Sequence, residues 1–213
     1  AADFKRFGRP RLAFLVNSGV IDSMVNHYTA AKKPRSEDAY APGNRAGQRP
    51  DRAVIVYTNC IREAYRNMPV ILGGLEASLR RFAHYDYWSD KVRRSILADS
   101  GANPLVYGMG ERAIVEIAQS LDAGVPVETI DYVRGTAYLK ATDEEIGPWL
   151  DENNRERPNR VLPDFQTVAQ DKKAYASTYA LQKRQTDSVS SGRLLQVHGR
   201  ETVCVNPPAF PLE

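Results

Sequence analysis

The 213-residue sequence contains few residues of the kinds that bind metals or form disulfide frameworks. It has two cysteines, Cys60 and Cys204, and three histidines, His27, His84 and His198, which are scattered along the chain. No C-x-x-C and no C-x-x-x-C-x-x-C motif occurs, which excludes a cysteine-ligated zinc site or iron–sulfur cluster within these residues. Two isolated thiols are typical of reduced cysteines in the cytosol, so we expect a cytoplasmic protein.

Long apolar segments and a strong charge of one sign are missing as well. No stretch approaches the ~20 apolar residues that a membrane span needs, and no signal-peptide pattern opens the chain. The formal net charge is only +3, which by itself does not argue for nucleic-acid binding. We therefore expect neither a membrane nor a nucleic acid as partner. The sequence also lacks an initiator methionine and ends in Pro-Leu-Glu, so we expect a fragment whose terminal residues are native or vector-derived.

What the sequence does contain is an alternation of strand and helix patterns over residues 1–140. Predicted strands lie in residues 11–19, 69–74, 103–110 and 133–140, and predicted helices lie in residues 20–30, from about 50 to 67, from 76 onward, in 89–99 with Ser89 as N-cap, and in 111–124. Glycines follow the strands. This pattern predicts a three-layer α/β fold with a mainly parallel sheet.

Two segments allow more than one interpretation. The run AVIVY near residue 55 is typical of a strand, but Val54, Thr58, Ile61 and Tyr65 fall on one helical stripe, which favours the helix. Residues 31–50 contain three prolines and two glycines without periodicity, and they are basic. A loop this long inside a compact domain is usually functional or disordered.

The C-terminal third differs from residues 1–140 in composition and pattern. Residues 141–160 are polar and interrupted by proline, and we interpret them as a linker or surface excursion. Residues 161–213 are expected to form one polar helix and a β-hairpin that turns at His198–Arg200, an appendage that leads out of the fragment.

Ligands of open parallel sheets bind beyond the carboxyl ends of the strands. The glycine-bearing strand ends and the helix starts behind them could therefore hold a phosphate or carboxylate. The candidate residues are Gly19, Gly73, Gly74, Glu76, Ser78, Gly108, Gly110 and Glu111. Neither G-x-G-x-x-G nor G-x-x-x-x-G-K-[ST] occurs, so tight turns that need flexible backbone explain the glycines equally well.

A segment rich in arginine and aromatic residues follows the second glycine corner. The residues that we single out in this arginine–aromatic segment, residues 80–94, are Arg80, Arg81, His84, Tyr85, Asp86, Tyr87, Trp88, Asp90, Arg93 and Arg94. Buried unpaired charges are costly, so these arginines either pair internally or line a cleft for an anion or an acidic partner surface. Candidate internal partners are Glu76, Asp86, Asp90, Asp99 and Glu111. The aromatic residues either pack the fold or form a stacking wall, and His84 is more plausible as a hydrogen-bonding residue than as a catalyst.

Two motifs carry a family resemblance. The stretches PVILGGLEASLRRFAHYDYWSDKVRRSILADS and YGMGER, together with YTAAKKPRSEDAYAPGNRAGQRPDRAVIVYT, closely resemble the N-terminal region of YgiQ-like radical SAM proteins. The likeness covers most of residues 7–212 and weakens over 141–160. It implies a Rossmann-like domain, similar to cobalamin-binding domains, whose first strand lies upstream of residue 1 and whose radical SAM barrel follows residue 213.

The resemblance also carries implications about cofactors. The parent would use a 4Fe-4S cluster and S-adenosylmethionine, both held by the barrel, and this fragment would hold no cofactor. The axial-histidine signature D-x-H-x-x-G does not occur in the chain and would lie upstream, so cobalamin stays possible but less favoured.

Three functions follow from these observations. The first is a non-catalytic N-terminal domain of a radical SAM enzyme, which packs on its own barrel and helps to form the site for an unknown substrate. The second is a stand-alone binding module for an anionic small molecule, such as a nucleotide or a cobalamin-like compound, at the glycine turns. The third is an RNA-binding accessory domain that uses the basic loop, residues 31–50.

Overall fold

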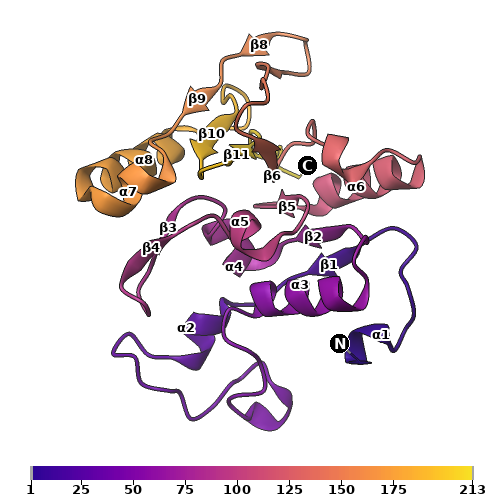
Figure 1. The fold of residues 1–213 in the computed structure, drawn as a ribbon, viewed down its shortest axis with the longest axis vertical. Helices are drawn as coiled ribbons and strands as arrows, with labels where there is room; N and C mark the ends of the chain where they lie inside the picture. Colours follow the sequence, from indigo (N-terminus) through magenta and orange to yellow (C-terminus); the bar gives the residue numbers. More distant parts are fainter. Residues whose placement is uncertain (1, 213) are drawn as a thin grey trace.

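The computed structural model describes residues 2–212 and shows an α/β fold built on one main sheet (Figure 1). Within these residues, the sheet has seven strands in the spatial order β1 (Phe14–Val16), β2 (Val70–Leu72), β5 (Leu105–Val106), β6 (Thr136–Ala141), β11 (Glu201–Val205), β10 (Leu194–Val197) and β9 (Arg160–Val161). Strands β1, β2 and β5 are parallel, β6, β11 and β10 follow antiparallel, and β9 is parallel to β10. The predicted α/β class is confirmed, and the parallel strands are those that end in glycine corners.

Helices cover both faces of this sheet. The structure has helices α1 (Ala2–Lys5), α2 (Ser23–His27), α3 (Ala53–Ala64), α4 (Gly74–Leu79), α5 (Ile96–Ser100), α6 (Glu111–Asp122), α7 (Phe165–Gln170) and α8 (Lys172–Arg184), with short 3-10 turns at Pro42–Asn44 and Val127–Thr129. Strand β2 shows why the fold has three layers. Val70 and Leu72 pack in one core with α3 and α5, whereas Ile71 faces the opposite core with α6. Each fully buried aliphatic side chain of this kind contributes about 1.5–3 kcal/mol.

The ambiguous segment near residue 55 is a helix, as its stripe predicts. Val54, Thr58 and Ile61 are buried on one side of α3, and the Ser23 hydroxyl accepts a hydrogen bond from the Ala53 amide at 3.1 Å. The apolar run AVIVY therefore serves a helix that covers the sheet, because burial on one stripe determines the outcome more than β propensity does.

Two predictions from the sequence are wrong in detail. Ser89 does not begin a helix: residues 91–93 form strand β4 (Lys91–Arg93), which pairs with β3 (His84–Asp86), and the N-cap of α5 is Ser95, whose hydroxyl accepts from the Leu97 amide. The predicted polar helix is two helices, because Asp171 leaves helical geometry and its side chain caps α8 by accepting from the Lys173 amide at 2.8 Å.

The C-terminal hairpin turns where the sequence predicts, between β10 and β11, but it is not an appendage. Strand β11 pairs with β6 along its whole length, so the hairpin extends the main sheet. Residues 141–160 contain a small hairpin of β7 (Trp149–Leu150) and β8 (Glu156–Arg157), with Trp149 buried. Within the described residues, no helix is long and apolar enough to cross a membrane.

Candidate functional site

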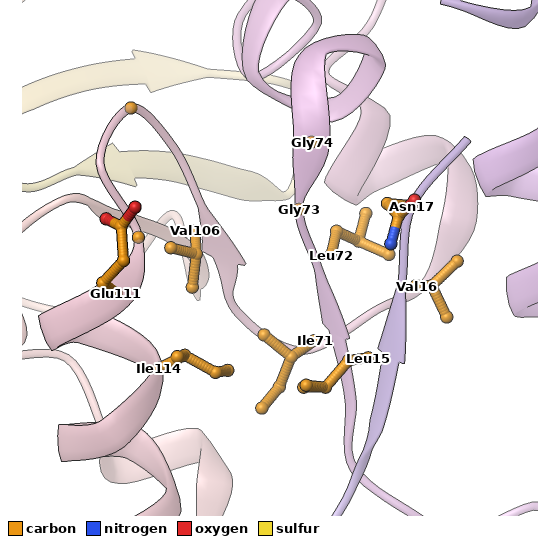
Figure 2. A pocket seen from close by; sticks show the side chains of 12 residues that line it. Leu15, Val16, Asn17, Ile71, Leu72, Gly73, Gly74, Val106, Glu111 and Ile114 are labelled. Carbon is orange, nitrogen blue, oxygen red and sulfur yellow. The ribbon is translucent and has the colours of Figure 1, made fainter. Parts of the chain in front are cut away.

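The carboxyl ends of β1, β2 and β5 meet at one edge of the sheet and border a cavity of about 380 Å³ (Figure 2). The residues that line it come from these three strands and the start of α6: Leu15, Val16, Asn17, Ile71, Leu72, Gly73, Gly74, Val106, Gly108, Gly110, Glu111 and Ile114. Five of the eight candidate residues are therefore brought together, namely Gly73, Gly74, Gly108, Gly110 and Glu111. Gly19 borders a neighbouring cavity of about 400 Å³.

Close backbone packing explains two of these glycines. Gly74 has φ +80°, and a Cβ atom there would lie 3.0 Å from the Asn17 Cβ. A Cβ atom at Gly110 would lie 2.8 Å from a methyl group of Val106. The positive φ of Gly74 and the close approach of the Val106 side chain to Gly110 thus account for both positions without any ligand.

The cavity is mostly apolar, and the charged side chain that lines it is a carboxylate, which does not favour the binding of an anion. Figure 2 shows the side chains of Leu15, Ile71 and Ile114 near one another at its floor. Glu111 occupies the first turn of α6, where its negative charge already complements the positive end of the helix. A second anion would be repelled by this carboxylate.

Two of the predicted residues lie elsewhere. Glu76 is fully buried, and its carboxylate accepts hydrogen bonds from the Ser23 amide at 2.9 Å and the Val54 amide at 3.3 Å. Ser78 donates to the Gly74 carbonyl at 2.8 Å within α4. Glu76 therefore joins the starts of α2 and α3 to α4.

The arginines of the arginine–aromatic segment are largely engaged within the fold. Arg80 pairs with Asp22, and both are mostly buried. Arg93 and Arg94 each lie 3.1 Å from Asp99, one of the predicted partners.

Arg81 is engaged in a different way. It donates to the Ser78 carbonyl at 2.6 Å and lies over the ring of Tyr107, 4.7 Å from its centre. The arginine side chains of this segment thus mainly make contacts within the fold.

Asp86 is the best-neutralised carboxylate of the segment. It accepts from Arg52 and from the Ser89 hydroxyl, each at 2.6 Å. Burial alone would raise the pKa of Asp86, but these hydrogen bonds outweigh burial and lower the pKa to about 2. Glu76, Asp90 and Glu111 are not arginine partners in the described residues.

The aromatic residues and His84 also make internal contacts. The Tyr85 hydroxyl donates to Asp90 at 2.6 Å, Tyr87 donates to the Met24 carbonyl at 3.4 Å, and Trp88 packs on Tyr28 with ring centres 4.1 Å apart. His84 contacts the Phe82 carbonyl at 3.2 Å, and burial lowers its pKa to about 4.

The basic loop, residues 31–50, is fastened to this segment and to the end of β1. Lys32 donates to the Trp88 carbonyl at 2.9 Å, and Arg35 donates to the Val25 carbonyl at 3.1 Å. Arg49 donates to the Ser18 carbonyl at 2.6 Å and lies 3.2 Å from Asp38. Three of its five basic side chains are therefore used inside the fold.

Sequence reasoning missed two ion-pair partners, Asp22 and Arg52. They lie 58 and 34 residues from Arg80 and Asp86, and such separations leave no local signal. Asp22 did carry one detectable feature, since an aspartate before a helical pattern predicts the N-cap that it forms by accepting from the Met24 amide at 2.9 Å.

Exposed apolar side chains follow each of the three parallel strands. We call Val20, Leu75, Leu79 and Met109 the apolar rim; their exposed fractions range from 43% to 72%. Val20 follows β1, Leu75 and Leu79 lie on α4 directly after β2, and Met109 follows β5. Val20 lines the cavity beside Gly19, Leu75 and Met109 are chain neighbours of glycines that line the strand-end cavity, and Leu79 lies one helical turn beyond Leu75 on α4.

The chain leaves the sheet at the same edge. The Gly135 amide donates to the Pro207 carbonyl and the Tyr107 amide to the Gly135 carbonyl, both at 2.8 Å, so Pro207, two residues after β11, and Tyr107, directly after β5, both lie beside Gly135. Asn206 fixes this point, since its side-chain amide donates to the Asp131 and Val133 carbonyls, each at 2.9 Å.

The described residues do not fit an iron–sulfur cluster. Cys204 is buried and Cys60 partly buried, both are free, and among residues 2–212 no group of three or more His, Cys, Asp or Glu side chains could hold a metal ion. The three histidines contact Asp51, the Phe82 carbonyl and Gln196, and none of them lines the strand-end cavity, so no axial ligand for cobalamin is present there.

Comparisons with known proteins give a consistent result. The model of the family described as "Radical SAM N-terminal" matches residues 1–213. A "UPF0313 protein" from Clostridium botulinum strain ATCC 19397 is 50% identical over 210 residues, which are 99% of this chain and 31% of the relative. A "UPF0313 protein" from Clostridium perfringens strain SM101 is also 50% identical over 210 residues, 30% of its length. The chain thus spans about a third of these relatives. No solved structure matches it significantly.

Proposed function

We infer the function from a plain premise, which is that this chain belongs to the Radical SAM N-terminal family. We propose that it is a non-catalytic domain of a longer radical SAM protein, and that it packs through the strand-end edge on the rest of that polypeptide. In this role it would cover the catalytic part and help to form the substrate site.

The observation that carries the proposal is the apolar rim. Scattered exposed apolar residues are normal on a protein surface, but an apolar group that follows three adjacent strand ends is typical of a contact surface. The edge is also where open α/β sheets place their ligands, so a partner that covers it would enclose the cavity of about 380 Å³.

The exit of the chain supports the same arrangement. Pro207 and Pro208 follow β11 at this edge, and Arg134 donates to the Pro208 carbonyl at 3.2 Å and lies over the ring of Phe210 at 4.2 Å. The last described segment is therefore held against the edge. A polypeptide that continues from it would begin near the first turns of α6, the helix that follows the β5 corner.

The distribution of charge indicates what kind of contact this would be. The arginines of residues 80–94 are paired or packed within the fold, so they offer little free charge to an acidic partner. We therefore propose that apolar burial provides most of the docking energy, at roughly 25 cal/mol per Å² of apolar surface. The iron–sulfur cluster and S-adenosylmethionine belong, in this proposal, to the remainder of the polypeptide.

The stand-alone anion-binding module is the weaker alternative. The corner after β2 leads into the short helix α4 (Gly74–Leu79), and the corner after β5 leads into α6, whose first turn already holds Glu111. No lysine or arginine lines the strand-end cavity between these corners.

The test uses acidic substitutions on the apolar rim. Leu79→Asp and Met109→Asp should change the stability of the 213-residue chain by less than about 0.5 kcal/mol, because both side chains are exposed. In the longer polypeptide each should destabilise the packing of this domain by more than about 2 kcal/mol, because a carboxylate would be buried unpaired. Thermal unfolding of both proteins measures the difference.

The control is Val189→Asp, an equally exposed valine in the segment between α8 and β10. It should be silent in both proteins. If the rim variants behave like Val189→Asp in the longer polypeptide, the strand-end edge is not the packing surface.

A further inference from the structure

Strand β1 is an open edge of the main sheet. Its one neighbour in the described sheet is β2, and the ladder uses the backbone of Phe14 and Val16: the Phe14 amide donates to the Pro69 carbonyl and the Val16 carbonyl accepts from the Gly73 amide, both at 2.9 Å. Successive residues of a strand direct their hydrogen-bonding groups to opposite sides. The N–H and C=O groups of Leu15 therefore face away from β2, and no described residue bonds to them.

Both faces of this edge are apolar and incompletely covered. The Leu15 side chain is 61% exposed beside the cavity of about 380 Å³ on the α6 face. On the α3 face a second cavity, of about 230 Å³, lies between Phe4, Phe14 and Tyr57. Figure 2 shows Leu15 and Val16 pointing to different sides of β1. The open edge thus has unfilled space both above and below the plane of the sheet.

An unpaired apolar edge is a template for another strand, and proteins normally blunt such edges with charge, proline or a covering segment. Strand β1 has the sequence Phe-Leu-Val, so it contains neither a charged residue nor a proline. The opposite edge of the sheet, β9, differs, because its two residues are Arg160 and Val161. The β1 edge is therefore the one that requires a cover.

We propose that the β1 edge accepts one further strand, apolar on both faces, from the part of the longer polypeptide that lies outside residues 1–213. This inference rests on the proposed function for the source of that strand, since the relatives extend well beyond the matched region and this chain covers only 31% of one of them. The added strand would bond to the Leu15 backbone, and its side chains would fill the two cavities. It would also close the open side of the cavity at the glycine corners.

A strand that is buried on both faces has a recognisable composition. It would be a run of apolar, β-branched residues without alternation, as strand β2 is. A strand with one polar face would leave one of the two cavities unfilled and would not meet the requirement.

Amide hydrogen exchange tests the proposal at single-residue resolution. In the 213-residue chain the Leu15 amide should exchange nearly freely, whereas the Val16 amide, which faces β2, should be protected. In the longer polypeptide the Leu15 amide should gain about 100-fold or more in protection, as expected of a bonded sheet amide. Exchange at Leu75, in the apolar rim, is measured in the same samples.

A pair of matched variants provides a second readout. Leu15→Glu and Val161→Glu each place a charge on an exposed apolar residue at opposite edges of one sheet. Both should leave the melting temperature of the 213-residue chain nearly unchanged. In the longer polypeptide, Leu15→Glu should lower the melting temperature of this domain and abolish the added protection at Leu15, and Val161→Glu should do neither.

The outcomes separate this inference from the proposed function. Protection at Leu75 without protection at Leu15 would overturn the added strand and leave the docking surface intact. Free exchange at both positions would overturn both. Protection of Leu15 in the 213-residue chain that rises with protein concentration would also overturn the inference, because a second copy of the chain would then cover the edge.

Discussion

A single buried carboxylate can connect several segments of this fold through hydrogen bonds. Glu76 accepts backbone hydrogen bonds from Ser23 and Val54, so one side chain satisfies amides at the starts of two helices. From the sequence, Glu76 was an equally good candidate for a ligand site or an ion pair. Only the fold shows that its partners are amides 53 and 22 residues away.

We predict that Glu76→Gln destabilises the chain by about 1.5–3 kcal/mol, because the side-chain amide is a weaker acceptor than the carboxylate and its NH2 group would face one of the two backbone amides, a donor against a donor. Urea unfolding measures the loss. Glu63→Gln, at an exposed position of α3, is the matched control and should change stability by less than about 0.5 kcal/mol. Equal stability of the two variants would show that the Glu76 contacts contribute nothing.

Buried histidines predict how stability depends on pH. Burial lowers the pKa values of His84 and His198 to about 4. His198 contacts Gln196 at 3.0 Å and stacks on Phe165, so the folded state holds this ring neutral. The unfolded chain binds protons at these rings below pH ~6.5.

The unfolded state is therefore favoured as pH falls, and the free energy of unfolding should decrease between pH 6.5 and 5 by up to about 1.4 kcal/mol per pH unit for each histidine. Denaturant titrations at several pH values measure the slope. His198→Gln should reduce it, and a free energy of unfolding that stays constant from pH 7 to 5 would contradict the neutral burial of these rings.

At the scale of elements, α2 and the turn after α4 are coupled by one ion pair. Asp22 caps α2 and also pairs with Arg80, whose side chain is mostly buried. Burial lowers the pKa of Arg80, which reflects the cost of keeping this charge inside the fold.

Asp22→Asn keeps a capping side chain but removes the charge, and we expect it to destabilise the chain by about 3–5 kcal/mol. Asp122→Asn serves as control, because Asp122 pairs with Arg11 at the surface and that pair should contribute less than about 1 kcal/mol. Thermal and chemical unfolding of both variants give the comparison. A cost for Asp22→Asn as small as that of the control would show that Arg80 is solvated in the folded state.

The elements also show what the sequence could and could not reveal. Helix α3 was predictable, because its buried stripe contains Val54, Thr58 and Ile61. Ser89 was misleading, because a serine before an amphipathic run is a plausible N-cap, whereas pairing of β3 with β4 is a tertiary fact. The pairing of β11 with β6 could not be predicted either. A local hairpin pattern is the same whether the hairpin forms an appendage or extends the main sheet.

At the scale of the whole molecule, the glycine corners meet as the strand pattern predicted, since parallel strands end at a common edge. The arginine–aromatic segment is fastened to α2, to the loop 31–50 and to α5 by contacts that only the fold reveals. The apolar rim remains exposed near this edge, together with the polar residues Asn17 and Glu111. The sequence predicted where the site lies, but it did not predict that apolar side chains are exposed there. The exposure of Val20 or Met109 depends on what covers the strand ends.

Methionine oxidation tests the central claim, which is that the strand-end edge packs on the rest of the polypeptide. Met109 belongs to the apolar rim and is 43% exposed, whereas Met24 and Met68 are buried at 0% and 4% and serve as internal references. Sulfoxide formation by dilute peroxide, followed by mass spectrometry, depends on exposure. In the 213-residue chain Met109 should oxidise much faster than the other two. In the longer polypeptide its rate should fall to theirs, and an unchanged rate at Met109 would contradict the account.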